Sequence, residues 1–256
     1  MFIHSINPVL LKLGAFEIRY YGLFYAVGFM IAYFMISYLA KIKGLSINKD
    51  DVADFLLYEI IGVILGARIF YILFYNLRFY LSNPFEMLAI WHGGLSFHGG
   101  LIGASIAGFY FCKKKKIDFY DIADIVVIPL ALALALGRIG NFMNGELYGR
   151  ITNMPWAVKF PNAEGFRHPS QIYASLKNLL IFFTLWNLKG KKLPKGFIFW
   201  LFVIMYAALR FFVEFFREPD EQLGFIAGFL TMGQILSVVM FFAGIIFVHK
   251  IYRSNK

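Results

Sequence analysis

The residues most suited to chemistry lie close together in the stretch 137–150. Within fourteen residues it contains two Arg, two Asn, one Glu, one Tyr and four Gly. A guanidinium group is a planar fork that suits phosphate, Asn and Glu fix hydrogen-bond geometry, and Gly lets backbone approach a ligand closely. The same residues would also suit a polar helix cap and turn at a membrane interface. The stretch therefore predicts either an anion-binding site or a helix end.

Charged residues inside apolar runs are a second signal. A charge at the centre of a membrane helix costs about 2.5–3.5 kcal/mol, so it usually faces the bundle interior and has a role. Arg210, Glu214 and Arg217 are spaced i, i+4 and i+7 and share one helix face. One carboxylate against two guanidinium groups favours an anionic ligand, although a salt bridge that only joins helices is the alternative. In another run, Arg68 fits a ligand or an internal partner such as Glu59 equally well.

Arg138, within the stretch 137–150, and three histidines outside these clusters are further candidates. Arg138 ends an apolar run, where it could bind a ligand or extend to lipid headgroups. His98 lies among glycines; a neutral imidazole with a pKa of about 6.5 can take a proton from a thiol with a pKa of about 8.5, but it could also be an interfacial hydrogen-bonding residue. We interpret His92 and His168 as structural. No His pair has a metal-ligand spacing such as i, i+4, so neither a metal nor a cofactor is expected.

Three motifs together indicate a family. Residues 137–149 fit the pattern G-R-x-G-N-F-x-N-x-E-x-x-G, residues 92–100 read H-G-G-L-S-F-H-G-G, and residues 210–217 read R-F-F-V-E-F-F-R. In these motifs and their order the sequence resembles the prolipoprotein diacylglyceryl transferases, from residue 20 to residue 220. Enzymes of that family move a diacylglyceryl group from phosphatidylglycerol to a cysteine thiol of a secreted lipoprotein precursor.

The resemblance implies roles for particular residues. Arg138 and Arg210 would hold the lipid phosphate, and His98, the second His of its motif, would act as general base. The catalytic residues implied are His98, Arg138 and Arg210, and the substrate-binding residues are Arg138, Asn141, Asn144, Glu146, Gly149, Tyr21, Glu214 and Arg217. The implied partners are phosphatidylglycerol, the lipobox of the prolipoprotein signal peptide and the surrounding membrane lipids.

Composition sets the protein class. Hydrophobic residues make up 60% of the chain and charged residues only 16%, whereas a soluble domain has about 25% charged residues. The formal net charge of +10 could suggest nucleic acid, but the basic residues form short clusters between apolar runs, which is a topology signal. The single cysteine excludes an internal disulfide. We expect a polytopic membrane protein with no nucleic-acid partner.

Seven apolar runs approach the length of about 20 residues that a membrane span needs. They cover residues 20–40, 54–75, 95–112, 122–138, 172–188, 197–216 and 226–248. The predicted fold is all-α, a single integral membrane domain over residues 1–256 with seven transmembrane helices. Residues 140–170 would form a small head on the outer face of the bacterial inner membrane. Small residues recur every four positions at Gly62/Gly66 and Gly99/Gly103/Ala107, so those two helices should approach closely.

Lysine placement predicts the orientation. The connections after the first, third, fifth and seventh runs are rich in lysine, including the cluster at residues 113–116, which fits a stop-transfer signal beside anionic headgroups. The positive-inside rule then puts the N-terminus outside and the C-terminus in the cytoplasm, with Arg217 and Asp220 on the outer face.

Two other function classes fit part of the pattern. A carrier of lipids or organic anions would also bury arginines beside a cavity, but many carriers have internal repeats and this sequence has none that we detect. A structural membrane subunit fits the spans but does not account for the polar stretch at residues 137–150.

Overall fold

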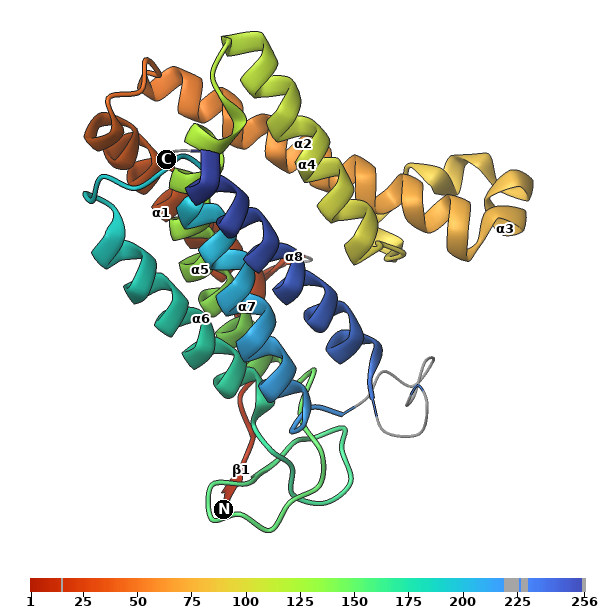
Figure 1. Ribbon diagram of the computed structural model, residues 1–256. Helices are drawn as coiled ribbons and strands as arrows, with labels where there is room; N and C mark the ends of the chain where they lie inside the picture. Colours follow the sequence, from red (N-terminus) through yellow and green to blue (C-terminus); the bar gives the residue numbers. More distant parts are fainter. Residues whose placement is uncertain (15, 219–225, 227–229, 255–256) are drawn as a thin grey trace. The chain divides into compact units, whose positions relative to one another are not determined.

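The computed structural model describes residues 1–14, 16–218, 226 and 230–254, and these are mostly helical (Figure 1). Among them, five helices are long and apolar enough to cross a membrane: α1 (Tyr20–Lys43), α2 (Lys49–Tyr75), α5 (Phe119–Asn144), α7 (Phe197–Glu214) and α8 (Met232–Ser254). Helices α4 (Phe97–Lys115) and α6 (Ser170–Leu188) have 19 residues each and fall short of the same criterion. The protein is a multi-pass helical membrane protein, and the count of seven spans stays a prediction.

Short strands depart from the all-α expectation. β1 (Phe2–Ile3) pairs in parallel with β4 (Val158–Lys159), and β2 (Val9–Leu13) pairs antiparallel with β3 (Phe16–Arg19). Strands of two to five residues are too short for a clear alternating pattern, so the sequence did not reveal them. The predicted outer position of Asp220 lies outside the described residues.

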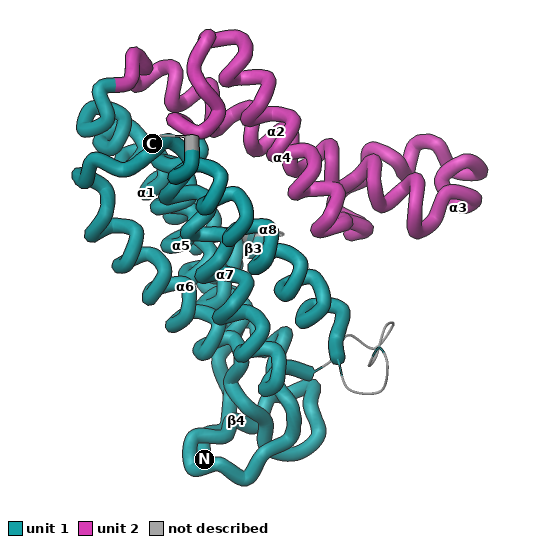
Figure 2. Tube along the Cα trace, viewed as in Figure 1, with its two compact units in different colours: residues 1–44, 123–256 teal, residues 45–122 magenta. Residues whose placement is uncertain are grey.

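The chain forms two compact units, drawn in different colours in Figure 2. Unit 1 comprises residues 1–44 and 123–256, and unit 2 comprises residues 45–122. Unit 2 contains α2, α4, the short helix α3 (Leu77–Ser82) and two 3-10 turns, η1 (Pro84–Met87) and η2 (Ile90–His92).

Glycines bring α2 and α4 into backbone contact. A Cβ atom on Gly103 would lie 1.9 Å from the carbonyl oxygen of Gly62, and one on Gly66 would lie 2.3 Å from that of Gly99. Only residues without a side chain fit at this separation, so the predicted close approach of the two helices is confirmed. The lysine cluster adds to the pairing, because Lys114 Nζ donates to the Tyr58 hydroxyl at 2.7 Å.

A buried aspartate ties together one end of the unit 1 bundle. Asp124, on α5, is 1% exposed and forms an ion pair with Lys43 of α1 at 2.8 Å. Its two carboxylate oxygens accept from the backbone N–H groups of Gly196 and Phe199, at 3.0 and 2.8 Å. Because α7 begins after a glycine, which offers no capping side chain, Asp124 supplies the cap from another helix.

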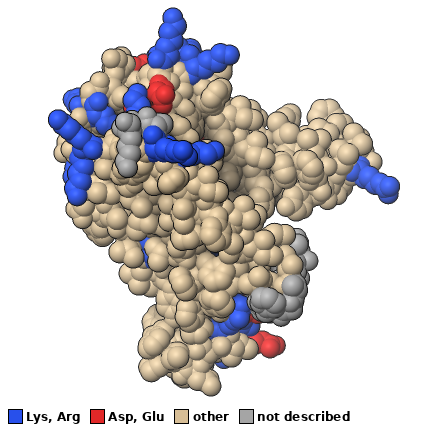
Figure 3. Space-filling view, viewed as in Figure 1, with Lys and Arg blue, Asp and Glu red and all other residues tan. Residues whose placement is uncertain are grey.

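Basic side chains gather at this end of unit 1. Figure 3, which draws both units, shows Lys and Arg side chains on the surface of unit 1 at this end. The C-terminal turn of α8 lies there too, because the Tyr252 ring contacts the Phe197 ring at 5.6 Å. The helix ends and connections there carry Lys41, Lys43, Lys189, Lys191, Lys192, Lys195, Lys250 and Arg253.

The opposite end of unit 1 carries the polar segment, with two boundaries that differ from expectation. Helix α5 continues to Asn144, not Arg138, so the connection to α6 covers residues 145–169. Helix α8 begins at Met232, because Thr231 and Gln234 form a reciprocal capping pair at its start: Gln234 N–H donates to Thr231 Oγ1 and Thr231 N–H to Gln234 Oε1. The strand β1 pairs with the 145–169 segment through β4.

Candidate active site

The polar stretch 137–150 forms the end of helix α5 and the turn that follows it. Asn141 and Asn144 lie on the last turns of the helix, not in a loop, and both direct an amide at Glu146. The distances from their Nδ2 atoms to Glu146 Oε1 are 2.9 and 3.2 Å. The turn is possible because Gly145 adopts a left-handed φ of +69°. These two amides therefore fix the position of one carboxylate oxygen.

The start of α6 holds the same turn from the other side. Gln171 Nε2 donates to the carbonyl oxygen of Glu146 at 2.7 Å, and Ser170 Oγ donates to that of Leu147 at 3.0 Å. Gln171 is 1% exposed and Ser170 is 3% exposed, so neither bond competes with bulk solvent. Glu146 itself is exposed. The turn thus presents a carboxylate whose backbone is rigidly held.

Gly149 joins this segment to the end of α7. Its N–H donates to the carbonyl oxygen of His168 at 2.8 Å, and the next N–H, of Arg150, donates to that of Phe216 at 2.9 Å. A Cβ on Gly149 would lie 2.3 Å from the Phe216 oxygen and 2.7 Å from His168 Cβ. The residue at this position must therefore be glycine for steric reasons within the protein itself.

Two arginines, Arg210 on α7 and Arg217 three residues past its end, surround one buried carboxylate. Arg210 Nη2 lies 2.7 Å from Glu214 Oε2, and Arg217 Nη1 lies 3.8 Å from Glu214 Oε1. Thr231 Oγ1 also donates to Glu214 Oε1 at 3.1 Å, and Glu214 is only 3% exposed. The shared helix face predicted from the spacing is confirmed for Arg210 and Glu214, whereas α7 ends at Glu214 and Arg217 lies beyond it.

Arg138 lies near this group without a carboxylate of its own. Its side chain forms no ion pair or hydrogen bond among the described residues, yet its charge acts on Arg210 and on Tyr21. Tyr21 packs on α5, where a Cβ on Gly140 would lie 3.2 Å from the Tyr21 ring, and it hydrogen-bonds the Tyr25 hydroxyl at 2.9 Å. Unit 1 therefore brings together Tyr21, Arg138, Asn141, Asn144, Glu146, Gly149, Arg210, Glu214 and Arg217.

Comparison with known proteins identifies the family. A family model described as prolipoprotein diacylglyceryl transferase matches residues 8–250. The chain belongs to this family. Proteins named phosphatidylglycerol–prolipoprotein diacylglyceryl transferase are similar over nearly their whole length. The protein of Geobacter sulfurreducens is 50% identical to this chain, over 94% of this chain and 93% of its own length. That of Desulfotalea psychrophila is 45% identical, over 94% of this chain and 91% of its own length. That of Vibrio cholerae is 42% identical, over 98% of this chain and 93% of its own length.

In this member of the diacylglyceryl transferase family, Arg68 proves to be structural. It is 4% exposed, and its guanidinium donates to five carbonyl oxygens of the segment between α3 and α4, including those of Met87 at 3.0 Å and Ala89 at 3.1 Å. The Tyr80 ring covers it at 5.0 Å. All five of its N–H donors are therefore satisfied within unit 2, and Glu59 is not its partner.

The histidines occupy different settings. His98 is exposed on the first turn of α4, in unit 2. His92 Nδ1 lies 2.8 Å from Glu86 Oε2. His168 packs between Phe216 and Tyr173 and its Nδ1 is 3.1 Å from the Tyr173 hydroxyl. Burial lowers the pKa of His168 below its usual 6.5, so it is neutral at pH 7 and its contacts are those of a packing residue.

One charged residue of unit 1 was missed from the sequence. Lys177, on α6, is 6% exposed; its Nζ donates to Asn178 Oδ1 at 2.8 Å and lies 3.8 Å from the centre of the Tyr206 ring. The rule that marked Arg68 and Arg210, a charge inside an apolar run, applies equally to a lysine within residues 172–188 and would have found it.

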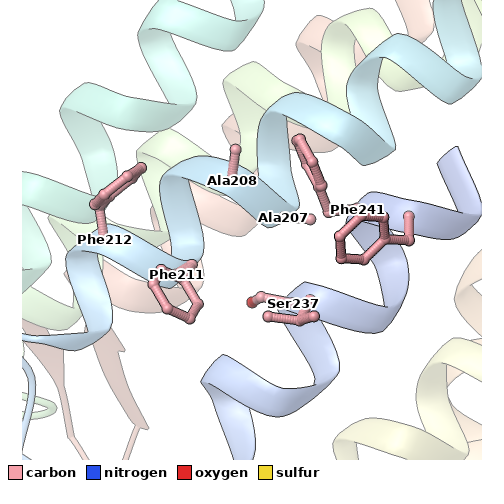
Figure 4. A pocket seen from close by; sticks show the side chains of 8 residues that line it. Ala207, Ala208, Phe211, Phe212, Ser237 and Phe241 are labelled. Atoms are coloured by element: carbon pink, nitrogen blue, oxygen red, sulfur yellow. The ribbon is translucent and has the colours of Figure 1, made fainter. Parts of the chain in front are cut away.

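An apolar groove lies between α7 and α8 (Figure 4). Its one polar side chain, Ser237, already donates to the carbonyl oxygen of Gly233 at 2.7 Å, so the groove offers hydrocarbon surface only. The lining residues are Ala207, Ala208, Phe211, Phe212, Ser237, Val238, Phe241 and Phe242.

Proposed function

We propose that this protein transfers the diacylglyceryl group of phosphatidylglycerol to the thiol of the lipobox cysteine of a prolipoprotein, the first step of bacterial lipoprotein maturation. The proposal rests on membership of the prolipoprotein diacylglyceryl transferase family, whose curated members carry both substrates in their names. The structural observation that supports it is the group of cations around Glu214, buried within an apolar helical bundle. Buried positive charge of this kind suits an anionic lipid headgroup.

In the reaction, the cysteine thiolate attacks the glyceryl carbon that bears the phosphate ester. A carbon–sulfur bond forms, the carbon–oxygen bond breaks, and its electron pair stays on the phosphate oxygen. The products are a thioether and glycerol phosphate. The negative charge of the thiolate passes to the leaving phosphate, so cations aimed at that phosphate stabilise the transition state more than the ground state.

Arg138 and Arg210 are the proposed phosphate ligands. Arg210 is held by Glu214, which leaves the guanidinium positioned but only partly neutralised. Arg138 has no ion pair among the described residues, so its fork is available to a phosphate. Arg217 and Gly149 then act from the edge of the site, Arg217 through Glu214 and Gly149 by holding the 145–169 segment against α7.

Glu146 is the proposed contact for the headgroup glycerol. Because two asparagine amides fix Oε1, the second oxygen can accept from a glycerol hydroxyl without losing its orientation. Asn141 and Asn144 thus act through Glu146. Tyr21, which interacts electrostatically with both Glu146 and Arg138, completes this side of the site.

His98 is the proposed general base for the thiol, and the groove of Figure 4 is the proposed seat of one acyl chain. The exposure of His98 on the first turn of α4 leaves its ring accessible to a substrate. The groove suits an acyl chain because burying each CH₂ group of the lipid contributes about 0.8 kcal/mol.

For the membrane arrangement we propose a single membrane domain of seven spans in the bacterial inner membrane. The cationic end of unit 1 (Figure 3) would then be cytoplasmic. The N-terminus and the segment 145–169 would lie on the outer face, where lipoprotein precursors arrive, and the C-terminus in the cytoplasm.

The test is transfer of labelled diacylglycerol from phosphatidylglycerol to a lipobox peptide by the purified full-length protein. Lipid-linked peptide and free glycerol phosphate should form in equal amounts. Arg138→Lys and Arg210→Lys should each slow transfer about ten- to a hundredfold, because losing one hydrogen bond to a charged group costs about 1.5–3 kcal/mol. Arg19→Lys is the matched control, since Arg19 is exposed and pairs only with Glu17 among the described residues.

Movement of lipid without any lipid-linked peptide would contradict the transferase and favour a carrier. Wild-type rates in both lysine variants, measured with phosphatidylglycerol limiting, would remove the two arginines from the phosphate site while leaving the reaction itself standing.

A further inference from the structure

Lys177 is a buried amine that the phosphate site described above does not use. It is 6% exposed, and among the described residues no carboxylate lies within ion-pair distance of it. Its two contacts are neutral: the Asn178 side-chain oxygen at 2.8 Å and the face of the Tyr206 ring at 3.8 Å. Burying an ammonium group without an opposite charge is costly, so the Lys177 amine should carry its proton only when a bound anion balances the charge.

The helix contacts place Lys177 one turn below the arginine pair. Ser175, two residues before it, donates to the carbonyl oxygen of Ala135 on α5 at 3.0 Å. Arg138 follows Ala135 by three residues, and Arg210 follows Tyr206 by four. At 1.5 Å per residue, both arginines therefore lie about 4.5–6 Å further along their helices, towards the end that carries residues 145–169.

The charges of this neighbourhood do not balance. Both Arg210 and Arg138 are close enough for their positive charges to act on Lys177. Arg210 contacts the carboxylate of Glu214, which Arg217 shares. Among the described residues this is the only carboxylate within ion-pair distance of any of Arg138, Arg210 and Lys177, and a phosphodiester headgroup brings only a single negative charge.

We propose that Lys177 is the third cation of the anion site and stabilises the second negative charge that the phosphate gains as glycerol phosphate departs. This rests on the transferase function proposed above. In the substrate the phosphodiester is a monoanion. When the carbon–oxygen bond breaks, the leaving group becomes a phosphate monoester dianion, because the charge of the thiolate has passed to it. A cation set deeper than the arginine pair then acts on the transition state and the product more than on the bound lipid.

A matched lysine separates this role from simple packing. Lys189, at the other end of α6, also lies 3.8 Å from an aromatic ring centre, that of Trp186. It is half-buried rather than buried, and its hydrogen bond goes to a backbone oxygen. A purely structural lysine–aromatic contact predicts similar effects at both positions, whereas the anion role predicts an effect at Lys177 alone.

The experiment compares Lys177→Met and Lys189→Met in the full-length protein, since methionine keeps most of the side-chain volume without the charge. For Lys177→Met we expect kcat to fall about tenfold or more, the KM for phosphatidylglycerol to change by less than about twofold, and the midpoint of thermal unfolding to stay the same or rise. Glycerol 1-phosphate, added as product, should inhibit the variant more weakly than the wild type. Lys177→Arg, which keeps the charge, should recover part of kcat. Lys189→Met should behave as wild type.

An unchanged kcat in Lys177→Met would overturn the proposal. So would equal losses of kcat and thermal stability in both methionine variants, because these would indicate packing. Direct binding of glycerol 1-phosphate without peptide keeps the two hypotheses apart. If the wild type makes no lipid-linked peptide but binds glycerol 1-phosphate more tightly than Lys177→Met, the anion site stands and the transferase reaction falls.

Discussion

Gly149 offers the sharpest test of how the head segment positions the site. Adding a single methyl group, in Gly149→Ala, would put a Cβ 2.3 Å from the Phe216 carbonyl oxygen and 2.7 Å from His168 Cβ. Neither atom is the end of a flexible side chain, so neither can rotate away. To reach even 3.0 Å, the two segments would have to separate by about 0.7 Å (3.0 − 2.3).

That separation acts on two backbone hydrogen bonds of 2.8 and 2.9 Å, which tie residues 149 and 150 to His168 and Phe216. Overpacking costs about 1–3 kcal/mol, and each weakened hydrogen bond up to about 1 kcal/mol more. Because Phe216 follows the Arg210–Glu214 pair on the same chain segment, the shift also displaces the proposed phosphate ligands. A misplacement near 1 Å can cost about a hundredfold in rate, so we expect transfer to fall ten- to a hundredfold.

Two other glycines of the same stretch give a graded comparison in the transfer and thermal-unfolding assays. A Cβ on Gly137 would meet no atom within 4 Å, and one on Gly140 would meet the Tyr21 ring at 3.2 Å. Gly137→Ala should therefore be neutral or slightly stabilising, since Ala is the better helix former by about 1 kcal/mol, and Gly140→Ala should be intermediate. If Gly149→Ala keeps wild-type rate and unfolding temperature, or if Gly137→Ala is equally damaging, the steric reasoning is wrong.

The remaining predictions concern orientation, the lone thiol and acid sensitivity. In a Cys112→Ser background, Asn162→Cys should react with an impermeant thiol reagent in spheroplasts and Ser46→Cys should not; the reverse pattern would invert the topology. Cys112→Ser itself should transfer at nearly the wild-type rate, because Cys112 is buried in α4 and the reacting thiol belongs to the substrate; loss of rate with normal unfolding would imply a covalent enzyme intermediate. Burial lowers the pKa of His168 in the folded protein, so on acidification the unfolded state binds this proton first. The contribution of His168 to the stability of the fold is therefore complete above about pH 6.5 and declines as the pH falls towards its folded pKa. Between about pH 7 and pH 5, the midpoint of thermal unfolding should therefore fall less for His168→Asn than for the wild type. Parallel plots of midpoint against pH for the two proteins would contradict this.

Local patterns with short-range partners could be predicted from the sequence. The i, i+4 pair of Arg210 and Glu214 forms as expected at 2.7 Å because both residues belong to one helix. The small-residue spacing in α2 and α4 likewise predicted a contact that Gly103 makes with the Gly62 backbone. In both cases the periodicity of a single helix already determines which side chains share a face.

Features that depend on a partner from elsewhere in the chain could not be predicted. Gly140 looked like a helix end, but α5 continues past it because the missing side chain makes room for Tyr21 from α1. Similarly, Asn141 and Asn144 were expected to face the headgroup, whereas their amides go to Glu146 across the turn. The start of α8 is different, because its capping pair of Thr231 and Gln234 is local and could have been predicted from the sequence.

The buried charges show how a structural arginine differs from one that is available to bind a ligand. The cost of placing a charge in an apolar helix is the same for Arg68 and for Arg138, so its presence alone does not indicate function. Arg68 receives five carbonyl oxygens from a neighbouring segment and needs nothing further. Arg138 and Lys177 receive no carboxylate among the described residues, and the one that Arg210 receives is shared with Arg217. The protein satisfies the guanidinium of Arg68 with its own carbonyl oxygens, and we propose that a bound anion compensates the charges of Arg138, Arg210 and Lys177 in unit 1.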